Sequence, residues 1–268
     1  MTREKTNADF VESLARGLDV IKSFGTHRRA LSLTDLAAEA NLARATARRF
    51  LLTLEQLGYV KTTPAGFILT PRVLELGVAY TMSARVWEAA RVHLSELVDA
   101  TQQASSIAQL DGADIIYVAR VEVPKVVGVN IDVGTRYPAR STALGKVLLA
   151  SLGPEALAET LDKPSIARTP SYRACSDDDL RRELVEIRSR GWTSTSSEMT
   201  GGVRSIAAPI RQGGGEAFAA VNLSVIATEV SHDTLIEEYL PRLLVTAGEI
   251  GRDFALLQDA PQEMREAP

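Results

Sequence analysis

Three arginines, Arg44, Arg48 and Arg49, have the spacing that most clearly predicts a binding chemistry. They lie in residues 41–58, NLARATARRFLLTLEQLG, and at about 100° per residue around a helix they share one arc. The opposite arc is apolar and consists of Ala47, Phe50, Leu51, Leu54 and Leu57. Guanidinium groups bind phosphates and base edges, and positive charges early in a helix oppose its dipole. DNA is therefore the expected counter-charge, with a solvated basic face as the alternative.

The segments before this helix predict two further helices. Residues 32–40, SLTDLAAEA, form a short one with Ser32 as its cap. Residues 13–24 form the first one, capped by Ser13, and its predicted core face consists of Leu14, Leu18, Ile21 and Phe24. Two helices joined by a short turn, the second one basic, are typical of a helix-turn-helix.

A hairpin is predicted to follow the basic helix. We expect Asn41 to cap that helix and Gly58 to end it, after which residues 59–70 contain two β-prone runs around Pro64, Ala65 and Gly66. Three helices followed by a hairpin make a winged helix-turn-helix. The predicted DNA-binding residues are Arg44, Thr46, Arg48, Arg49 and Lys61.

Composition gives little support to catalysis or metal binding. The only cysteine is Cys175, and His27, His93 and His232 have no metal-ligand spacing. Neither a nucleotide-binding fingerprint nor a G-x-S-x-G motif is present. We expect no catalytic residue, no metal and no cofactor. The net charge is −4, but residues 1–82 hold 11 basic against 8 acidic residues, so the basic part is N-terminal.

The chain is expected to contain two domains joined by a helix, and to be cytoplasmic because no signal core or membrane-spanning run is apparent. The predicted limits are 9–70 for the DNA-binding domain, 71–84 for the linker helix and 85–258 for the second domain. Residues 259–268 are expected to be disordered. Thr70 and Pro71 start the linker helix, which is apolar on all sides and is therefore predicted to be buried and to contact a second copy. An ordinary core helix of the second domain is the alternative.

The second domain alternates predicted helices with predicted strands, which indicates an α+β fold with an antiparallel sheet covered by helices. The helices are expected over 86–103, 141–152, 155–161, 176–190 and 232–257. The strands are expected as a hairpin over 105–123 that turns at Asp111 and Gly112, and over 126–134, 192–198, 204–210 and 217–226.

Four segments together resemble the isocitrate-lyase-regulator (IclR) family of bacterial transcription regulators. They are SLARGLDVIKSF, LARATARRFLLTLEQLGYV, RYPARSTALGKVLLASL and SEMTGGVRSIAAPI, in this order. FILTPRVLELGVAY and the arginine-bearing helix further resemble the PcaR/PcaU/PobR branch, which controls aromatic-acid catabolism through the β-ketoadipate pathway. The resemblance implies a winged helix that binds palindromic promoter DNA, a homodimer or a tetramer, and a GAF-like effector domain.

The resemblance also implies an effector site. Carried over by position, its residues are Ala143, Leu144, Val203, Ser205, Asn222 and Ser224, with Thr195 and Glu198 near the rim. Two positions depart from many relatives: Arg140 stands in place of a histidine and Ser205 in place of a cysteine. For each polar residue, a bond to neighbouring backbone is the structural alternative to a bond to a ligand.

An apolar wall with hydroxyl, amide and cationic groups suits a small aromatic or dicarboxylic acid such as protocatechuate, 4-hydroxybenzoate or β-ketoadipate. The predicted cation is Arg140, beside a helix start, because Arg204 should face away from Ser205 on a strand. A surface ion pair is the alternative for Arg140.

Two functions are compatible with the residues alone. The first is an effector-responsive DNA-binding regulator, and the second is a small-molecule enzyme with an N-terminal assembly module. The arc of Arg44, Arg48 and Arg49 favours the regulator, because an assembly module has no need of it.

Overall fold

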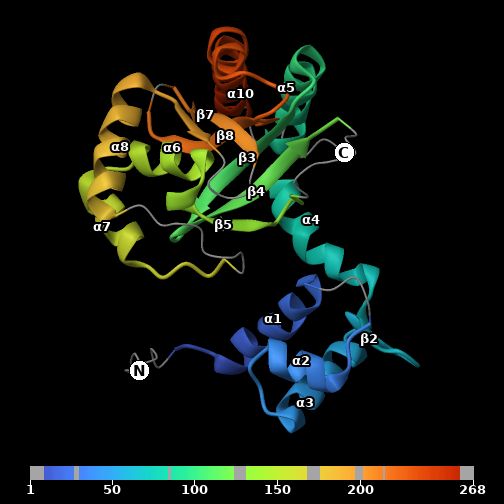
Figure 1. Ribbon diagram of the computed structural model, residues 1–268. Coiled ribbons are helices and arrows are strands. Elements are labelled where there is room, and N and C mark those ends of the chain that lie inside the picture. The colour runs from blue at the N-terminus through green and yellow to red at the C-terminus, as the bar shows by residue number, and fades with distance from the viewer. Residues whose placement is uncertain are drawn as a thin grey trace. The chain divides into compact units, whose positions relative to one another are not determined.

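The computed structural model describes residues 9–26, 30–83, 86–123, 131–167, 176–196, 202–213 and 215–259 (Figure 1). They form two compact units, Met1–Ala84 and Arg85–Pro268. Among the described residues, no helix is both long and apolar enough to cross a membrane.

The N-terminal unit is the predicted winged helix-turn-helix. Its helices are α1 (Glu12–Ser23), α2 (Leu33–Glu39) and α3 (Arg44–Gln56), with a single 3₁₀ turn, Phe24–Thr26, after α1. The wing is the antiparallel pair β1 (Val60–Thr63) and β2 (Gly66–Leu69). Leu31 pairs with Phe67 and so ties the wing to the start of α2.

The helix caps agree only in part with the sequence. Ser32 caps α2 as predicted, because its Oγ accepts from Asp35 N while the Asp35 carboxylate accepts from Ser32 N. The prediction for Ser13 is wrong: α1 begins before it and Val11 is the N-cap. The prediction for Asn41 is also wrong. Asn41 has a φ of 51°, which asparagine tolerates, and turns the chain after α2, so that Ala43 precedes α3.

The core-facing side of α1 also differs from the prediction. Leu14 and Leu18 are 63% and 41% exposed, whereas Phe24 is buried as predicted and Val20, which was not on the predicted face, is also buried. Gly17 lies against the ring of Phe50 in α3, at a distance where even a Cβ would make ordinary van der Waals contact. The helix is therefore rotated relative to the predicted face, and it leaves an apolar strip in solvent.

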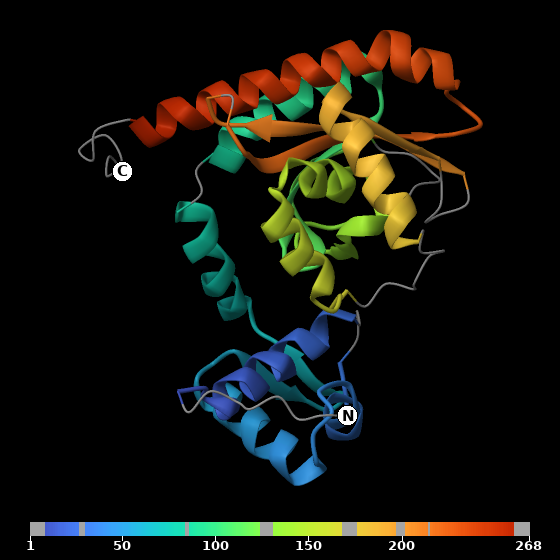
Figure 2. The ribbon, with the colours of Figure 1, turned by 90° about the vertical axis from the view of Figure 1, so that its left-hand side faces the viewer.

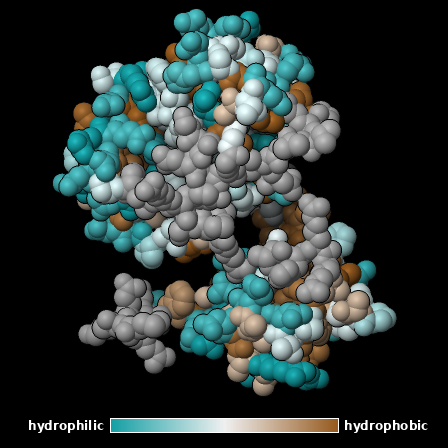
Figure 3. Space-filling view, viewed as in Figure 1, coloured by the Kyte–Doolittle hydropathy of each residue, from teal (hydrophilic) through white to brown (hydrophobic). Residues whose placement is uncertain are grey.

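The linker begins as predicted, with Thr70 accepting from Arg72 N at the start of the 3₁₀ turn Pro71–Val73. Helix α4 (Leu74–Ser83) follows, but the predicted burial is absent within one chain. Leu74, Leu76 and Tyr80 are 66%, 49% and 46% exposed. Brown, apolar surface is visible at the position of α4 in the space-filling view (Figure 3).

The helices of the C-terminal unit cover a single sheet. They are α5 (Val86–Thr101), α6 (Ala143–Ser151), α7 (Pro154–Asp162), α8 (Asp177–Arg190), α9 (His232–Thr234) and α10 (Leu240–Asp259). A π-helical turn, Leu235–Tyr239, joins α9 to α10, and the 3₁₀ turn Ala139–Ser141 precedes α6. Ser176 caps α8 and Gly191 ends it in the left-handed region, both as predicted.

The sheet is antiparallel throughout and has the order β5-β4-β3-β8-β7-β6. Its strands are β3 (Ala104–Asp111), β4 (Asp114–Val121), β5 (Arg136–Pro138), β6 (Thr193–Ser196), β7 (Val203–Arg211) and β8 (Ala217–Ile226). Helices α6, α7 and α8 cover one face, and α5 and α10 cover the other (Figure 2).

Some predictions fall where the structure gives no description. The strand expected over 126–134 falls largely on residues 124–130, which lie outside the described residues, and Ile131–Gly134 contains a turn. The strand that pairs with β4 is β5, a few residues later. His27, Cys175 and the tail from residue 260 also lie outside the described residues.

Helix α6 is held close to the preceding 3₁₀ turn by a glycine. A Cβ on Gly145 would lie 2.1 Å from the carbonyl oxygen of Ala139, so only glycine fits. The Gly145 N–H is also the donor to Thr142 Oγ1, the cap of α6, at 2.9 Å. The next residue, the buried Lys146, donates to Glu183 of α8 at 3.0 Å.

We predict that Gly145→Ala lowers the free energy of unfolding by about 1–3 kcal/mol or more, because the new Cβ must displace backbone. Gly248→Ala is the matched control: it is also helical, and a Cβ there meets nothing within 4 Å. The control should stabilise the protein by about 0.5–1 kcal/mol. Urea unfolding of both variants measures the difference, and equal stabilities would contradict the close contact.

Candidate DNA-binding face and effector site

The predicted DNA-binding residues of α3 lie on its exposed side. Arg44, Arg48 and Arg49 are exposed, and Thr46 is half-buried. Ala47, Leu51 and Leu54 are buried and fix the helix against the core. Among the described residues, the three arginines form no ion pair, and no side chain caps the start of α3. Their charges and the first N–H groups of the helix are thus available to an anion.

The wing holds Lys61 in an exposed position beside this helix. Glu55, in the last turn of α3, accepts from Thr62 N at 2.9 Å and so connects the helix to β1. Thr63 Oγ1 donates to Gly66 O at 2.8 Å and closes the turn of the hairpin. Helix and wing therefore present their basic residues from one connected unit.

The three polar residues predicted for the effector site are in contact. Asn222 Nδ2 donates to Ser224 Oγ at 3.0 Å, and the hydroxyls of Ser224 and Ser205 share a hydrogen bond of 3.0 Å. Ser205 and Asn222 come from neighbouring strands, β7 and β8, whose register pairs Ser205 with Ser224. Asn222 also accepts from Ser106 N at 3.0 Å. The cluster lies on the face covered by α6, since Ala207 and Ala220 beside it belong to that core.

Two further residues join this cluster, and sequence reasoning missed both. Arg120 of β4 donates through Nη1 to Ser106 Oγ of β3 at 2.9 Å. A bulge in the hairpin explains the omission. Tyr117 pairs with Ala108, but Ala119 pairs with Ile107, so one extra residue of β4 lies between them. Without this residue Arg120 would point to the other face of the sheet.

The remaining predicted residues surround the cluster less directly. Ala143 and Leu144 are buried at the start of α6, and Val203 is half-buried opposite Ile226. Thr195 pairs with Ser205 in the register, and Glu198 lies outside the described residues. Arg204 donates to Val230 O at 3.1 Å, in keeping with the expected separation from Ser205.

Arg140 forms a surface ion pair, which is the alternative to binding an effector carboxylate that the sequence left open. Its Nη2 donates to Asp177 Oδ1 at the start of α8, and the Arg140 side chain is 31% exposed. The helix that we expected beside it begins only at Ala143, after the 3₁₀ turn. The role of Arg140 toward an effector carboxylate stays a prediction, and the ion pair with Asp177 favours the alternative.

Two tyrosines lie on the same face as Arg120, and one of them, Tyr117, is close to it. Tyr117 and Tyr137 meet edge to face, with ring centroids 6.0 Å apart and an interplanar angle of 78°. Burial raises the pKa of Tyr117 well above its ordinary value, Tyr137 raises it further, and the charge of Arg120 lowers it in part. The hydroxyl is neutral at physiological pH, and the guanidinium is close enough to act on it.

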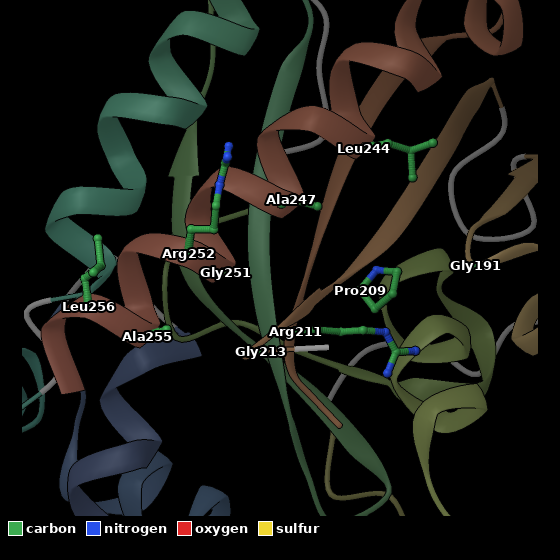
Figure 4. A pocket seen from close by; sticks show the side chains of 11 residues that line it. Gly191, Pro209, Arg211, Gly213, Leu244, Ala247, Gly251, Arg252, Ala255 and Leu256 are labelled. Carbon is green, nitrogen blue, oxygen red and sulfur yellow. The ribbon is translucent and has the colours of Figure 1, made fainter. Parts of the chain in front are cut away.

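A separate groove of about 670 Å³ lies along α10, away from the predicted site residues. Leu244 and Ala247 of α10 line it together with Pro209 and Arg211 of β7 (Figure 4). None of the predicted effector residues contributes to it.

Both units match models of one family. Residues 13–64 match the IclR helix-turn-helix domain, and residues 78–252 match the bacterial transcriptional regulator IclR C-terminal domain. The chain belongs to the IclR family. It is accordingly a DNA-binding transcriptional regulator and not an enzyme with an assembly module.

Several IclR-family relatives cover most of the chain. The Pca regulon regulatory protein of Pseudomonas putida is 34% identical over 90% of this chain and 84% of its own length. The p-hydroxybenzoate hydroxylase transcriptional activator of Acinetobacter baylyi is 32% identical over 93% of this chain and 94% of its own. These relatives agree with the branch that the sequence resembles.

Solved structures of similar proteins agree with this IclR fold. A regulator from Rhodococcus sp. RHA1 has a TM-score of 0.79 and 44% identity, and the match covers 92% of this chain and 100% of that one. An IclR homologue from Microbacterium hydrocarbonoxydans, solved in complex with 4-hydroxybenzoate, has a TM-score of 0.76 and 25% identity. That match covers 91% of this chain and 99% of the other.

We predict that Asn222→Ala lowers the free energy of unfolding by about 1–3 kcal/mol, because it removes the acceptor of a buried backbone N–H at Ser106. Ser205→Ala, which loses one hydroxyl–hydroxyl bond on a half-buried residue, should cost under about 1 kcal/mol. Thermal and urea unfolding compare the two variants. Equal losses would mean that Asn222 does not organise the cluster.

Proposed function

We propose that this IclR-family regulator binds a palindromic promoter operator as a homodimer and responds to a small aromatic or dicarboxylic acid. In this proposal it controls genes of aromatic-acid catabolism. The observation that carries the proposal is the contact of Ser205, Asn222 and Ser224 in the face beneath α6, because these polar groups can satisfy a small polar ligand. Ala143, Leu144 and Val203 supply the apolar part of the proposed site.

The choice of effector class is supported by the relatives. Their names refer to the Pca regulon and to p-hydroxybenzoate hydroxylase, and one solved homologue is in complex with 4-hydroxybenzoate. Protocatechuate, 4-hydroxybenzoate and β-ketoadipate are therefore the acids to test first. A gel-shift titration against the promoter region beside its own gene, with and without each acid, tests the proposal. The proposal fails if no sequence-selective shift appears at micromolar protein, or if no acid changes it.

A separate prediction concerns which residues of α3 contact phosphates and which contact bases. We expect Arg44, Arg48 and Arg49 to divide between phosphate and base contacts, and Lys61 to contact the backbone from the wing. Losing a phosphate contact should reduce the slope of log K against log salt by about one unit for every DNA sequence. Losing a base contact should cost roughly 1–3 kcal/mol and relax the preference at one position.

Single alanine variants measured by fluorescence anisotropy at several salt concentrations test this division. Arg182→Ala is the control, since Arg182 is 77% exposed on α8 of the other unit and pairs with Asp179 there. It removes the same charge and should leave the slope unchanged. If all three α3 variants behave like this control, the recognition helix has been misassigned.

We also predict a homodimer held through the N-terminal unit. The exposed apolar residues of α1, of the two positions before it and of α4 are Phe10, Val11, Leu14, Leu18, Leu74, Leu76, Val78 and Tyr80. Exposed apolar surface of this extent is typical of interaction sites, and a dimer fits half-sites about 34 Å or a multiple apart.

Analytical ultracentrifugation of the wild type and of Leu74→Glu tests the dimer. The wild type should sediment as a dimer or a tetramer, and the variant should dissociate at concentrations where the wild type does not. Val185→Glu changes another exposed apolar residue, on α8, and should have no effect. A wild type that is monomeric at micromolar concentration would contradict the prediction.

A further inference from the structure

Arg120 is a cation in direct contact with the polar cluster beneath α6, through its hydrogen bond to Ser106. The register places it opposite Ser106, and Ser106 opposite Asn222, so the three residues form one row across β4, β3 and β8. The Arg120 side chain is 11% exposed, and a guanidinium so far out of water needs an anionic partner.

Glu122 provides that partner from the edge of the site. Its Oε2 accepts from Arg120 Nε at 2.9 Å and lies 2.7 Å from Nη2, so one carboxylate oxygen faces one edge of the guanidinium. The Glu122 side chain is 54% exposed. It can therefore turn into water at small cost, whereas Arg120 is anchored by its bond to Ser106.

The floor between the two ends of the row is made of small residues. Ala104, Ser106 and Ala108 are the residues of β3 on this face, opposite Ser224, Asn222 and Ala220 of β8. Strands lie about 4.8 Å apart, so Arg120 and Asn222 are separated by about 10 Å at the backbone. Because both side chains reach toward each other, the gap between the guanidinium and the amide is roughly as long as a substituted benzoate. The pair of rings Tyr117 and Tyr137 lies on the same face.

We propose that Arg120 binds the carboxylate of the effector and that Glu122 competes with it for the same edge of the guanidinium. This inference rests on the proposed response to an organic acid and names the residue that selects the acid. The effector carboxylate replaces that of Glu122, its ring lies over the small residues of β3, and its polar substituents reach Asn222 and Ser224. Binding then moves Glu122 away from Arg120.

Isothermal titration calorimetry on the full-length protein tests the exchange. The probes are 4-hydroxybenzoate, protocatechuate and β-ketoadipate, followed by the primary amide of each acid that binds. Arg120→Gln should weaken binding of the acid by about 10- to 100-fold and leave the weaker binding of the amide unchanged. Glu122→Gln should tighten binding of the acid by about two- to fivefold, because the competitor loses its charge.

The double variant is the sharpest measurement. In the Arg120→Gln background, Glu122→Gln should no longer change the affinity, because its effect acts only through the guanidinium.

Arg140→Gln removes the other candidate cation and should leave the affinity for the acid within about twofold of the wild type. Thermal melting of each variant, together with the amide titration, separates loss of binding from loss of fold, and Arg120→Lys should retain part of the affinity for the acid.

The outcomes distinguish this inference from the function on which it rests. If an acid binds the wild type and Arg120→Gln binds it equally well, the assignment of Arg120 is overturned while the acid-responsive regulator stands. If Glu122→Gln weakens binding, or acts equally in both backgrounds, the competition is overturned. If none of the three acids binds the wild type, the proposed effector class fails and the assignment fails with it.

Discussion

The effector unit depends on one constraint: polar side chains placed inside a covered sheet face must be hydrogen-bonded. Asn222 meets this constraint because its amide accepts from Ser106 N and donates to Ser224. Ser205 and Arg120 extend the contacts over four adjacent strands. A structural core could have used apolar residues here at lower cost, so the retention of this cluster is consistent with a ligand-binding role.

In the DNA-binding unit, by contrast, the charged side chains at the start of α3 have no partner of opposite charge among the described residues. Arg44, Arg48 and Arg49 stand exposed in the first turns of α3, where the helix dipole is positive and no side chain caps the N–H groups. The arrangement costs stability in the free protein and is compensated when a polyanion binds. Each unit therefore holds charge or polarity that a partner outside the chain can satisfy: DNA in one case and, in our proposal, a small acid in the other.

The sequence predicted best what depends on local pattern. The order of helices and wing, the cap at Ser32, the stop at Gly191 and the hairpin at Gly112 follow from periodicity and from turn or cap residues. The predicted caps Ser13 and Asn41 failed because capping residues are common and backbone geometry selects among them. The family resemblance assigned Ser205 and Ser224 to one site, and the pairing of β7 with β8 brings them into contact.

The position of Arg120 in the cluster could not be predicted from the sequence pattern. A hairpin with regular pairing from the turn at Gly112 places Arg120 on the face away from α6, and a single extra residue between Tyr117 and Ala119 reverses this. Nothing in the alternation of β4 marks the bulge. Likewise, the apolar residues of α4 predict burial, but one sequence does not name the surface that would cover them.

The proposed regulation requires that DNA binding be coupled to an acid bound beneath α6. The most direct test is to titrate the acid by calorimetry into the free protein and into its operator complex. The affinity for the acid then differs between the free protein and the operator complex by some factor. Linkage requires that the acid change the affinity for the operator by the same factor. We predict a matching difference of about 5- to 150-fold, the usual range for coupled sites. Equal affinities of the free protein and the complex for the acid would contradict the account.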